Sequence, residues 1–318
     1  MIQQPKAPGS RRAHDARAAG DGRSPSAEGA PPRRRGHDEN DGNRLGPWRL
    51  AGRLGRGQWA EVFEAMPADA ESRAAAYAVK VLREQWRHHA DAIEALRREA
   101  RVAAEVAHPR LVTVLSAAVD QPPHYLVMPK LQGDTLASPR RFGVSMALCI
   151  ARQVAEALAA LADAGWLHGD VKPANIVVSP GGHVTLIDLG CCRRLDEASP
   201  PAFRGTVAYA APETLTSSMV WDIRSEIYSL GVVLFELLEG GHPFPGRDAG
   251  ETAHHHLATP APDLRRRIPH LSSEVARLVA SMLAKEPLRR PQSAATLIHE
   301  LVALEIATLT DRAPPPSG

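Results

Sequence analysis

The sequence predicts an α+β fold of two lobes, a small β-rich N-terminal lobe with one main helix and a larger, mostly helical C-terminal lobe. Two observations favour this class. Up to about residue 130, short segments alternate apolar and polar side chains, as half-buried strands do. After Gly133, apolar residues recur at helical spacing instead. With 44% hydrophobic residues in a chain of 318, a sizeable core can be buried.

The N-terminal lobe is expected to be a five-stranded sheet with one helix. A first strand at 48–54 enters a glycine-containing turn, and its antiparallel partner follows at 61–65. Between 91 and 106, Ile93 and Leu96 begin an apolar series at helical spacing, which predicts the helix. The other strands are expected at 76–82, 111–118 and 124–128.

The C-terminal lobe is expected to consist of amphipathic and buried helices. Residues 227–238 are apolar enough to form a buried helix. Ser229 and Glu236 interrupt this run, and it is too short to span a bilayer. Further helices are expected at 146–162, 272–283 and 294–304.

Composition predicts that this domain extends from residue 45 to residue 305. Residues 1–44 are rich in Gly, Pro, Ala, Arg and Asp and carry almost no large apolar side chains. Such a segment cannot offset its ordering entropy by burial, so a disordered tail is expected. The two lobes are expected at about 48–130 and 131–305, followed by a short flexible tail at 306–318.

Charge and cysteine content exclude several classes of protein. A net charge of +2 is typical of neither a nucleic-acid-binding nor a membrane-surface protein. No segment is apolar over the length of a membrane span, and the N-terminus has no apolar signal core. The three cysteines indicate no disulfide framework. We therefore expect a cytoplasmic protein without a membrane span, and the sequence indicates no particular oligomeric state.

Chemistry-bearing side chains are concentrated in residues 168–175, which have the sequence HGDVKPAN. This loop places a carboxylate (Asp170), a cation (Lys172) and an amide (Asn175) close together. Thirteen residues after Asn175, Asp188 follows a largely apolar run and precedes Leu-Gly. Such a set can hold metal ions and a phosphate chain beside a hydroxyl nucleophile. The pattern therefore indicates phosphoryl transfer.

The order and spacing of these residues resemble the eukaryotic-like (Hanks-type) serine/threonine protein kinases of bacteria, over about residues 48–305. The resemblance implies a bilobal protein kinase fold that transfers the γ-phosphate of ATP to serine or threonine hydroxyls of protein substrates. Mg²⁺ is the implied metal, with Mn²⁺ as an alternative. Asp170 would be the catalytic base and Lys172 would neutralise charge at the γ-phosphate. Asn175 and Asp188 would hold the metal ions.

The segment 54–62 resembles the glycine-rich loop of these kinases, whose backbone approaches phosphate oxygens where a Cβ would collide. Gly55 and Gly57 match the family pattern, and Ala60 replaces its third glycine. Alanine is the smallest substitute, so nucleotide binding is expected to be retained.

Lys80 lies in an Ala-Val-Lys run one hairpin after this loop, and the resemblance implies that it reaches the α- and β-phosphates. Its flexible stem requires a carboxylate partner. Glu99 is the best candidate, because it lies on the predicted helix at the family's spacing. Glu94 and Glu105 are alternatives.

By the same resemblance, residues 125–131 form the last strand and the hinge between the lobes. Met128 would be the gatekeeper. The Pro129 carbonyl would accept a hydrogen bond from the adenine amino group, and the Leu131 N–H would donate to the ring. Proline lacks an N–H, but only its carbonyl is needed here. The residues expected to sandwich the base are Leu54, Val62, Ala78 and Val177. Periodicity alone favours interpreting those four as ordinary core.

The segment 205–213 resembles the peptide-binding loop of protein kinases and ends in Ala-Pro-Glu. Thr206 is expected to hydrogen-bond the catalytic Asp and Lys, as in kinases specific for serine and threonine. Glu213 requires a buried cation, and Arg290 matches the family's partner.

Three departures from the family pattern leave another function open. Gly169 stands where most members carry an Arg that receives a phosphate on the activation loop, so activity is expected to depend little on phosphorylation of Ser199 or Thr206. Glu226 replaces an Asp that caps the catalytic loop. Together with Ala60, these changes leave a weakly active pseudokinase, acting as a nucleotide-binding scaffold, as an alternative.

A kinase-like small-molecule phosphotransferase is a second alternative, because such enzymes also carry His-Gly-Asp. Lys172 disfavours it, since those enzymes usually have His at that place, and they lack the segment 205–213. Outside these motifs, the run His254-His255-His256 is not expected to bind a metal, because successive residues of a helix point in different directions.

Overall fold

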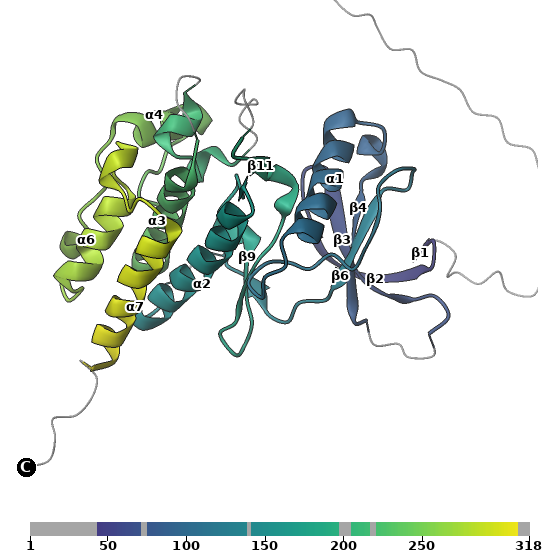
Figure 1. Ribbon diagram of the computed structural model, residues 1–318, viewed down its shortest axis with the longest axis horizontal. Helices are drawn as coiled ribbons and strands as arrows, with labels where there is room; N and C mark the ends of the chain where they lie inside the picture. The colour runs from purple at the N-terminus through teal and green to yellow at the C-terminus, as the bar shows by residue number, and fades with distance from the viewer. Residues whose placement is uncertain (1–42, 71–74, 139–140, 197–204, 217–220, 311–318) are drawn as a thin grey trace, which may run out of the picture. The chain divides into compact units, whose positions relative to one another are not determined.

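The computed structural model describes residues 43–70, 75–138, 141–196, 205–216 and 221–310. These residues confirm the α+β class, with a strand-rich N-terminal lobe and a helical C-terminal lobe in one compact unit (Figure 1). The tail predicted at the N-terminus up to residue 42, residues 311–318 and Ser199 lie outside the described residues.

The N-terminal lobe is an antiparallel sheet of six strands in the order β1-β2-β3-β4-β6-β5. Five were predicted. The additional strand forms because the chain turns at Gly46, with φ of +55°, and pairs Arg44 with Arg49. Arg44, predicted to end the tail, therefore belongs to the sheet. The strands are β1 (Arg44–Leu45), β2 (Trp48–Arg56), β3 (Ala60–Pro67), β4 (Tyr77–Leu82), β5 (Ser116–Ala118) and β6 (Tyr125–Pro129).

The strand predicted at 111–118 is reduced to β5 at its C-terminal end. Leu111 does not join this sheet, because it forms an isolated parallel bridge with Leu186 of the C-terminal lobe. The Val112 N–H donates to the Leu186 carbonyl at 3.0 Å, which ties the two lobes together beside the catalytic loop.

Helix α1 (Ala90–Glu105) lies beside the sheet (Figure 1). Ala92 and Leu96 on its buried face pack in a cluster with Leu82 and Leu126 of the strands. Its other neighbour is the short η4 helix (Leu189–Cys191), where a Cβ on Gly190 would lie 3.3 Å from the Ala95 carbonyl oxygen. The small residue allows α1 to approach the turn that carries Asp188.

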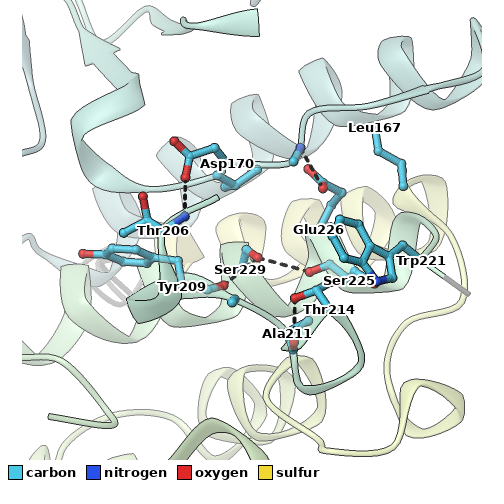
Figure 2. Close-up of a pocket in the computed structure, with 13 residues that line it drawn as sticks. Leu167, Asp170, Thr206, Tyr209, Ala211, Thr214, Trp221, Ser225, Glu226 and Ser229 are labelled. Carbon is cyan, nitrogen blue, oxygen red and sulfur yellow. Dashed lines mark hydrogen bonds between the residues drawn. The ribbon is translucent and has the colours of Figure 1, made fainter. Parts of the chain in front are cut away.

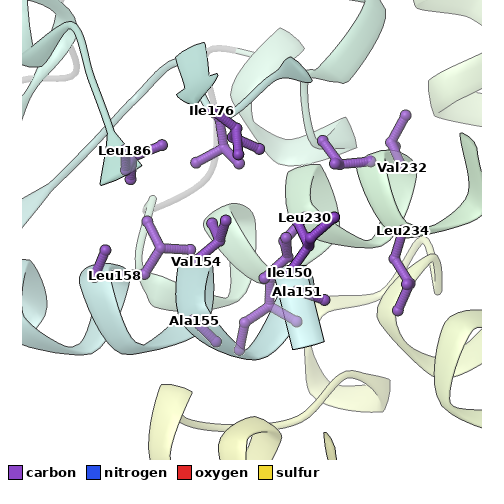
Figure 3. Packing of buried hydrophobic residues seen from close by; sticks show 14 of the residues in the cluster. Ile150, Ala151, Val154, Ala155, Leu158, Ile176, Leu186, Leu230, Val232 and Leu234 are labelled. Atoms are coloured by element: carbon purple, nitrogen blue, oxygen red, sulfur yellow. The ribbon is translucent and has the colours of Figure 1, made fainter. Parts of the chain in front are cut away.

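The core of the C-terminal lobe lies between α2 (Val144–Asp163), α3 (Ile223–Glu239) and strands β9 (Ile176–Val178) and β10 (Val184–Leu186) (Figure 3). Ile150 and Val154 of α2 and Leu230 of α3 are fully buried in it. A Cβ on Gly231 would lie 2.8 Å from the Met282 Cβ, so glycine allows α3 and α6 to pack closely. The helices are α2 (Val144–Asp163), α3 (Ile223–Glu239), α4 (Ala249–Ala258), α5 (Leu264–Arg267), α6 (Ser273–Met282) and α7 (Ala294–Thr310).

Two of these helices bear on sequence predictions. Within the described ranges, α2 is the one helix long and apolar enough to cross a membrane, but 56% of its apolar window is buried in the core. Helix α7 continues to Thr310, whereas the domain was predicted to end at 305. No glycine or proline interrupts the chain before Pro314, so the helix is not stopped earlier.

Small paired strands in the C-terminal lobe hold the loops that carry the motifs. The chain 168–175 runs from β8 to β9 and includes the short η3 helix (Pro173–Asn175), and Asp188 follows β10. The strands are β7 (Asp134–Thr135), β9 (Ile176–Val178) and β10 (Val184–Leu186) in one sheet, and β8 (Trp166–Leu167) and β11 (Arg193–Arg194) in another.

Candidate active site

Asp170 lies at the centre of a hydrogen-bond network in the catalytic loop, and Figure 2 shows its contact with Thr206. Its Oδ1 accepts the Thr206 backbone N–H at 2.9 Å, while its Oδ2 lies 2.6 Å from Lys172 Nζ and 3.1 Å from Asn175 Nδ2. The Asn175 amide also donates to the Asp170 carbonyl at 2.8 Å. Because Asp170 is only 8% exposed, these donors replace the water it has lost and fix the direction of its carboxylate.

His168 supports this loop, and sequence analysis assigned it no role. Its Nδ1 accepts the Asp170 backbone N–H at 3.3 Å, and its Nε2 lies 3.2 Å from the Ile187 carbonyl oxygen. The ring is fully buried, and burial lowers the pKa of His168. A neutral ring with its proton on Nε2 satisfies both partners, so it joins the backbone of the predicted base to the residue before Asp188.

Lys80 Nζ is shared by two carboxylates from different parts of the chain. It lies 2.6 Å from Glu99 Oε2 on α1 and 2.7 Å from Asp188 Oδ1. Of the other two candidate partners, Glu94 pairs with Arg98 at 3.6 Å, and Glu105 accepts a hydrogen bond from the Trp166 indole.

The electrostatics of this cluster favour its charged form. Burial alone would lower the pKa of Lys80, but Asp188 and Glu99 outweigh that effect and raise it above its usual range. The Lys80 charge lowers the pKa of Asp188. Burial pulls the pKa of Glu99 upward, against the effect of Lys80, yet the short contact and the strongly raised pKa of Lys80 indicate a charged pair.

Asn175 and Asp188 offer the oxygen atoms predicted to hold a metal. Among the described residues, Asp188 is the only non-glycine residue with positive φ, at +68°. Its side chain is 40% exposed, although Lys80 binds it. The Asn175 amide nitrogen is engaged by Asp170, which leaves its oxygen for a ligand. One amide oxygen and one carboxylate suit Mg²⁺ or Mn²⁺, because these ions also take water and phosphate oxygens.

This donor set is small. The described part of the chain holds no cluster of three or more His, Cys, Asp or Glu side chains suited to a metal ion. A cation at Asn175 and Asp188 would therefore depend on oxygen atoms supplied with the ligand.

The glycine-rich loop joins β2 to β3. The Gly57 N–H donates to the Ala60 carbonyl at 2.8 Å. A Cβ on Gly55 would meet no atom within 4 Å, and one on Gly57 would lie 3.5 Å from the nearest. Packing within the protein therefore does not require glycine at either position. Ala60 is 7% exposed and belongs to the cluster with Leu82 and Leu126, so its methyl group has a structural use.

The residues predicted to contact adenine form two groups. In the sheet, Ala78 lies opposite Met128 and Val62 lies opposite Lys80. Ala78 and Met128 are each 7% exposed, while Leu54 at the start of the loop is 47% exposed. The other three, Pro129, Leu131 and Val177, line a cavity of about 290 Å³ at the hinge together with Thr113 and Thr185. The first group does not line that cavity.

The peptide-binding segment begins at the catalytic loop. Lys172 Nζ donates to the Thr206 hydroxyl at 2.7 Å. Asp170 accepts the backbone N–H of Thr206, not its hydroxyl. Thr206 therefore contacts both residues named by sequence analysis, through two different groups.

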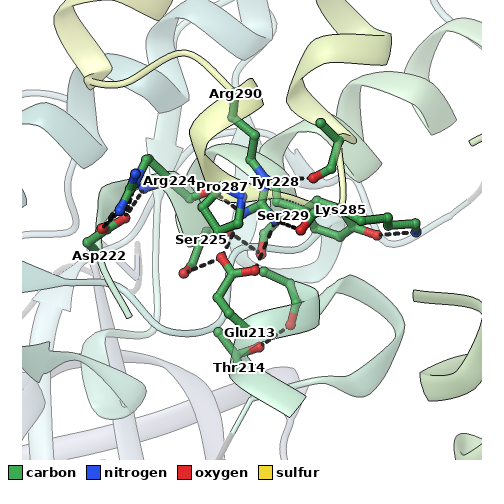
Figure 4. Close-up of polar contacts among 12 residues, drawn as sticks. Glu213, Thr214, Asp222, Arg224, Ser225, Tyr228, Ser229, Lys285, Pro287 and Arg290 are labelled. Atoms are coloured by element: carbon green, nitrogen blue, oxygen red, sulfur yellow. Dashed lines mark hydrogen bonds and ion pairs between the residues drawn. The ribbon is translucent and has the colours of Figure 1, made fainter. Parts of the chain in front are cut away.

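The far end of this segment is held by Glu213 (Figure 4). Arg290 donates to both of its oxygens, at 2.6 and 2.9 Å, and the Ser225 hydroxyl donates to it at 2.7 Å. The ion pair between Glu213 and Arg290 predicted from the sequence is thus present, with side chains 1% and 0% exposed.

Glu226 caps the catalytic loop, because its Oε1 accepts a hydrogen bond from the Gly169 N–H at 3.1 Å (Figure 2). Its Oε2 is buried and has no hydrogen-bond partner in the described part of the chain. Burial raises the pKa of Glu226 to about 7. The carboxylate borders a cavity of about 20 Å³ shared with Asp170 and Thr206, which is room for about one water molecule.

Known proteins are similar to this chain over most of its length. Residues 48–302 match the family described as protein kinase domain. Serine/threonine-protein kinase PknJ of Mycobacterium tuberculosis is 32% identical over 293 residues, 88% of this chain and 49% of PknJ. PknA of the same species is 32% identical over 286 residues, 85% of this chain and 65% of PknA. PrkC of Bacillus subtilis is 30% identical over 224 residues, 68% of this chain and 34% of PrkC. The chain thus spans from 34% to 65% of these relatives.

Proposed function

Because this chain belongs to the protein kinase family, we propose that it transfers the γ-phosphate of ATP to serine or threonine hydroxyls of proteins. The observation that carries the proposal is Lys80 Nζ bridging Glu99 at 2.6 Å and Asp188 at 2.7 Å. A lysine held by the main helix of the small lobe is the arrangement that orients nucleotide phosphates in these enzymes. The carboxylate of Asp188 stands beside it for the metal.

Asp170 is the base that orients the substrate hydroxyl and accepts its proton. Its Oδ1 is fixed by the Thr206 N–H, and Oδ2 by Lys172 and Asn175. A positioned base supplies roughly 10²–10⁴-fold in rate. Lys172, bonded to both Asp170 and Thr206, neutralises charge that develops on the transferred phosphate.

Asn175 and Asp188 would hold Mg²⁺, with Mn²⁺ as an alternative. The fit is supported by two hard oxygen donors and by the side-chain exposure of Asp188. When bound, the cation neutralises charge on the phosphates of ATP. The open space where a Cβ would stand on Gly55, with nothing within 4 Å, suits a backbone that approaches those phosphates. The adenine contacts proposed for Met128, Pro129 and Leu131 follow the family pattern.

Activity depends little on phosphorylation of the activation loop under this proposal. The family's phosphate-binding Arg cannot stand at position 169 without strain, because φ is +80° and a Cβ would lie 2.5 Å from the Cys191 carbonyl oxygen. Arg193, another cation of this lobe, contacts an aromatic ring instead, because its guanidinium carbon lies 4.5 Å from the centroid of the Trp221 ring. The Ser199→Ala variant should therefore keep most of the wild-type rate, and a large loss from this change alone would contradict the idea.

Protein substrates and a cytoplasmic location complete the proposal. Cys149, Cys191 and Cys192 all lie within the described residues and form no disulfide bond, which suits a reducing compartment where ATP is abundant. The net charge of +2 gives no reason to expect nucleic acid as a partner.

The proposal is tested with γ-labelled ATP, Mg²⁺ and a generic basic protein such as myelin basic protein, followed by phosphoamino-acid analysis. We expect label on serine or threonine, and a loss of about 10²-fold or more in Asp170→Asn. Nucleotide binding and thermal unfolding of the variant serve as folding controls. Equal, negligible transfer by both folded proteins would contradict kinase activity and favour a nucleotide-binding scaffold.

A further inference from the structure

Two imidazoles from different segments share one carbonyl oxygen in the peptide-binding segment. His242 Nε2 lies 2.6 Å from the Ala208 oxygen, and His256 Nε2 lies 2.8 Å from the same atom. His242 follows the end of α3 at Gly240, and His256 lies on α4. Sequence analysis assigned neither a role, since the first stands alone and the second belongs to a histidine run.

The hydrogen bonds fix the tautomer of each ring. A carbonyl oxygen can only accept, so both Nε2 atoms carry a hydrogen. His242 Nδ1 accepts the Phe244 backbone N–H at 3.0 Å. His256 Nδ1 lies 2.9 Å from the Tyr228 hydroxyl, whose oxygen in turn accepts from Lys285 Nζ at 3.1 Å (Figure 4). Both rings are therefore neutral donors to Ala208, and all four ring nitrogens are used.

Of the three histidines at positions 254–256, His256 is the buried one that contacts Ala208. Asp248 caps α4 by accepting the Glu251 N–H at 2.8 Å, and this start places His256 on the inner face, 0% exposed. His254 on the same helix is exposed. The His256 ring packs edge-on against Phe244 at 5.0 Å between centroids. Burial also lowers the pKa of His242, and lowers the pKa of His256 to about 4, so both rings stay neutral near pH 7.

The shared Ala208 carbonyl lies two residues after Thr206, which contacts the predicted base Asp170. Thr206 is tied to Asp170 by its N–H, and its carbonyl accepts the Tyr209 N–H at 2.9 Å. The next carbonyl after Ala208, that of Tyr209, accepts the Ser229 hydroxyl at 2.7 Å. One end of this turn is thus attached to the catalytic loop and the other to α3, with both imidazoles between them.

We propose that His242 and His256 are positioning residues for the protein substrate, because they hold the Ala208 carbonyl and thereby the backbone of residues 205–211 beside Asp170. This inference rests on the proposed kinase function. The nucleotide site is formed by other segments, so loss of the imidazoles should weaken use of the protein substrate and leave use of ATP unchanged. Because both rings donate to one oxygen, either can partly replace the other.

The kinetic test compares His242→Leu, His256→Leu and the double variant, with myelin basic protein and ATP varied separately. Loss of one neutral hydrogen bond should raise the KM for the protein substrate by roughly 5-fold. The double variant should exceed the product of the two single effects. The KM for ATP should stay within about twofold. His242→Gln, whose amide N–H replaces Nε2–H, should restore most of the loss, and His254→Leu is the matched control.

A second readout separates this inference from the proposed function. Amide hydrogen exchange at Tyr209 and Ala210, which close the turn by bonds of 2.9 and 3.1 Å, should accelerate in the double variant relative to His254→Leu. Half-buried His242 provides a single variant that should remain folded. If the wild type transfers no phosphate, the kinase proposal fails and exchange alone decides the positioning role. Unchanged exchange, an unchanged KM for the protein substrate, or equal changes in both KM values would overturn the inference.

Discussion

Two ion-pair clusters in this molecule differ in how fully the protein uses their polar atoms. Arg290 donates to both oxygens of Glu213 and to the backbone carbonyls of Arg224, Ala284 and Lys285, and the two side chains are 0% and 1% exposed. This pair is complete within the protein.

The cluster around Lys80 is open by comparison. Glu99 is 2% exposed, but the side chains of Lys80 and Asp188 are 16% and 40% exposed. Similar charges therefore serve different purposes, because the neighbours decide whether any hydrogen-bonding capacity is left. A saturated pair cannot lose one partner without destabilising the fold, and an open pair is available to a ligand.

The saturated pair should give the largest effect on stability. Arg290→Met leaves Glu213 buried without its cation, which should cost roughly 3–5 kcal/mol of the free energy of unfolding. Urea unfolding measures this. Arg224→Met is the matched control, because its partner Asp222 is 29% exposed at the side chain and such pairs contribute only about 0–1 kcal/mol. Equal losses of unfolding free energy in both variants would show that the buried pair matters no more to stability than the partly exposed pair does.

The open cluster should give its largest effect on rate. Asp188→Asn leaves Lys80 paired with Glu99 at 2.6 Å, so the free energy of unfolding should change by less than about 1 kcal/mol. Phosphate transfer should fall by about 10²–10³-fold, since a charged group at the phosphates is lost. A variant that loses stability but keeps its rate would show that this cluster is structural.

The motifs fix both residue type and spacing, and the fold that they predict is confirmed, while the catalytic roles of their residues stay predictions. Lys80, Asp170, Asn175 and Asp188 occur in order along the chain, and the fold follows from the same pattern. Spacing also favoured Glu99 over Glu94 and Glu105 as the partner of Lys80, and Glu99 is the residue that pairs with it. Such residues lie in short segments, so their chemistry can be recognised from the order of residues along the chain.

Other features could not be predicted, because they depend on which atoms meet across the fold. The pair of His242 and His256 on one carbonyl arises because the loop after α3 and helix α4 both meet residue 208, which no local pattern records. The hydrogen bond between Glu226 and Gly169, and the Oε2 atom that has no partner among the described residues, likewise follow from packing around the loop. The grouping of Leu131 and Val177 in a hinge cavity, apart from Met128, is a third case.

A smaller effect is expected where the catalytic loop has no room for a side chain. Gly169→Ala places a Cβ 2.5 Å from the Cys191 carbonyl oxygen at φ of +80°, which should cost about 1–3 kcal/mol and lower the transfer rate. Gly182→Ala is the matched control, since its φ is +78° but nothing lies within 4 Å. The control variant reports the effect of positive φ alone. Equal losses of unfolding free energy in both variants would therefore exclude a role for the contact with Cys191.

The last effect depends on pH and concerns Glu226, which belongs to neither cluster. Its pKa is raised from 4.5 to about 7, so the folded state binds the proton more tightly than the unfolded state. That stabilisation is present below about pH 4.5 and lost as pH rises through about 7. Glu226→Gln cannot ionise, so its stability relative to wild type should rise by about 1–3 kcal/mol from pH 5 to pH 8.

Unfolding free energies of both proteins across this range measure the difference. Asp170 and Arg193 act on Glu226 with opposite signs and are present in both proteins. His256, whose pKa is lowered to about 4, contributes stability that is lost as pH falls below 6.5, and this slope cancels in the comparison. A difference that stays flat with pH would mean that Glu226 does not titrate in this window.

The proposed function requires that the open charges of Lys80 and Asp188, together with the amide oxygen of Asn175, hold a metal-bound nucleotide. Its most direct test is the Tm of the wild type with ATP, measured with and without Mg²⁺, beside Asp188→Asn. Ligand at 100 times its Kd stabilises a protein by about 2.7 kcal/mol, so Mg²⁺ should add several degrees to the effect of ATP in the wild type. Asp188→Asn should lose that Mg²⁺-dependent rise. An equal rise in both proteins, or none in the wild type, would contradict the claim.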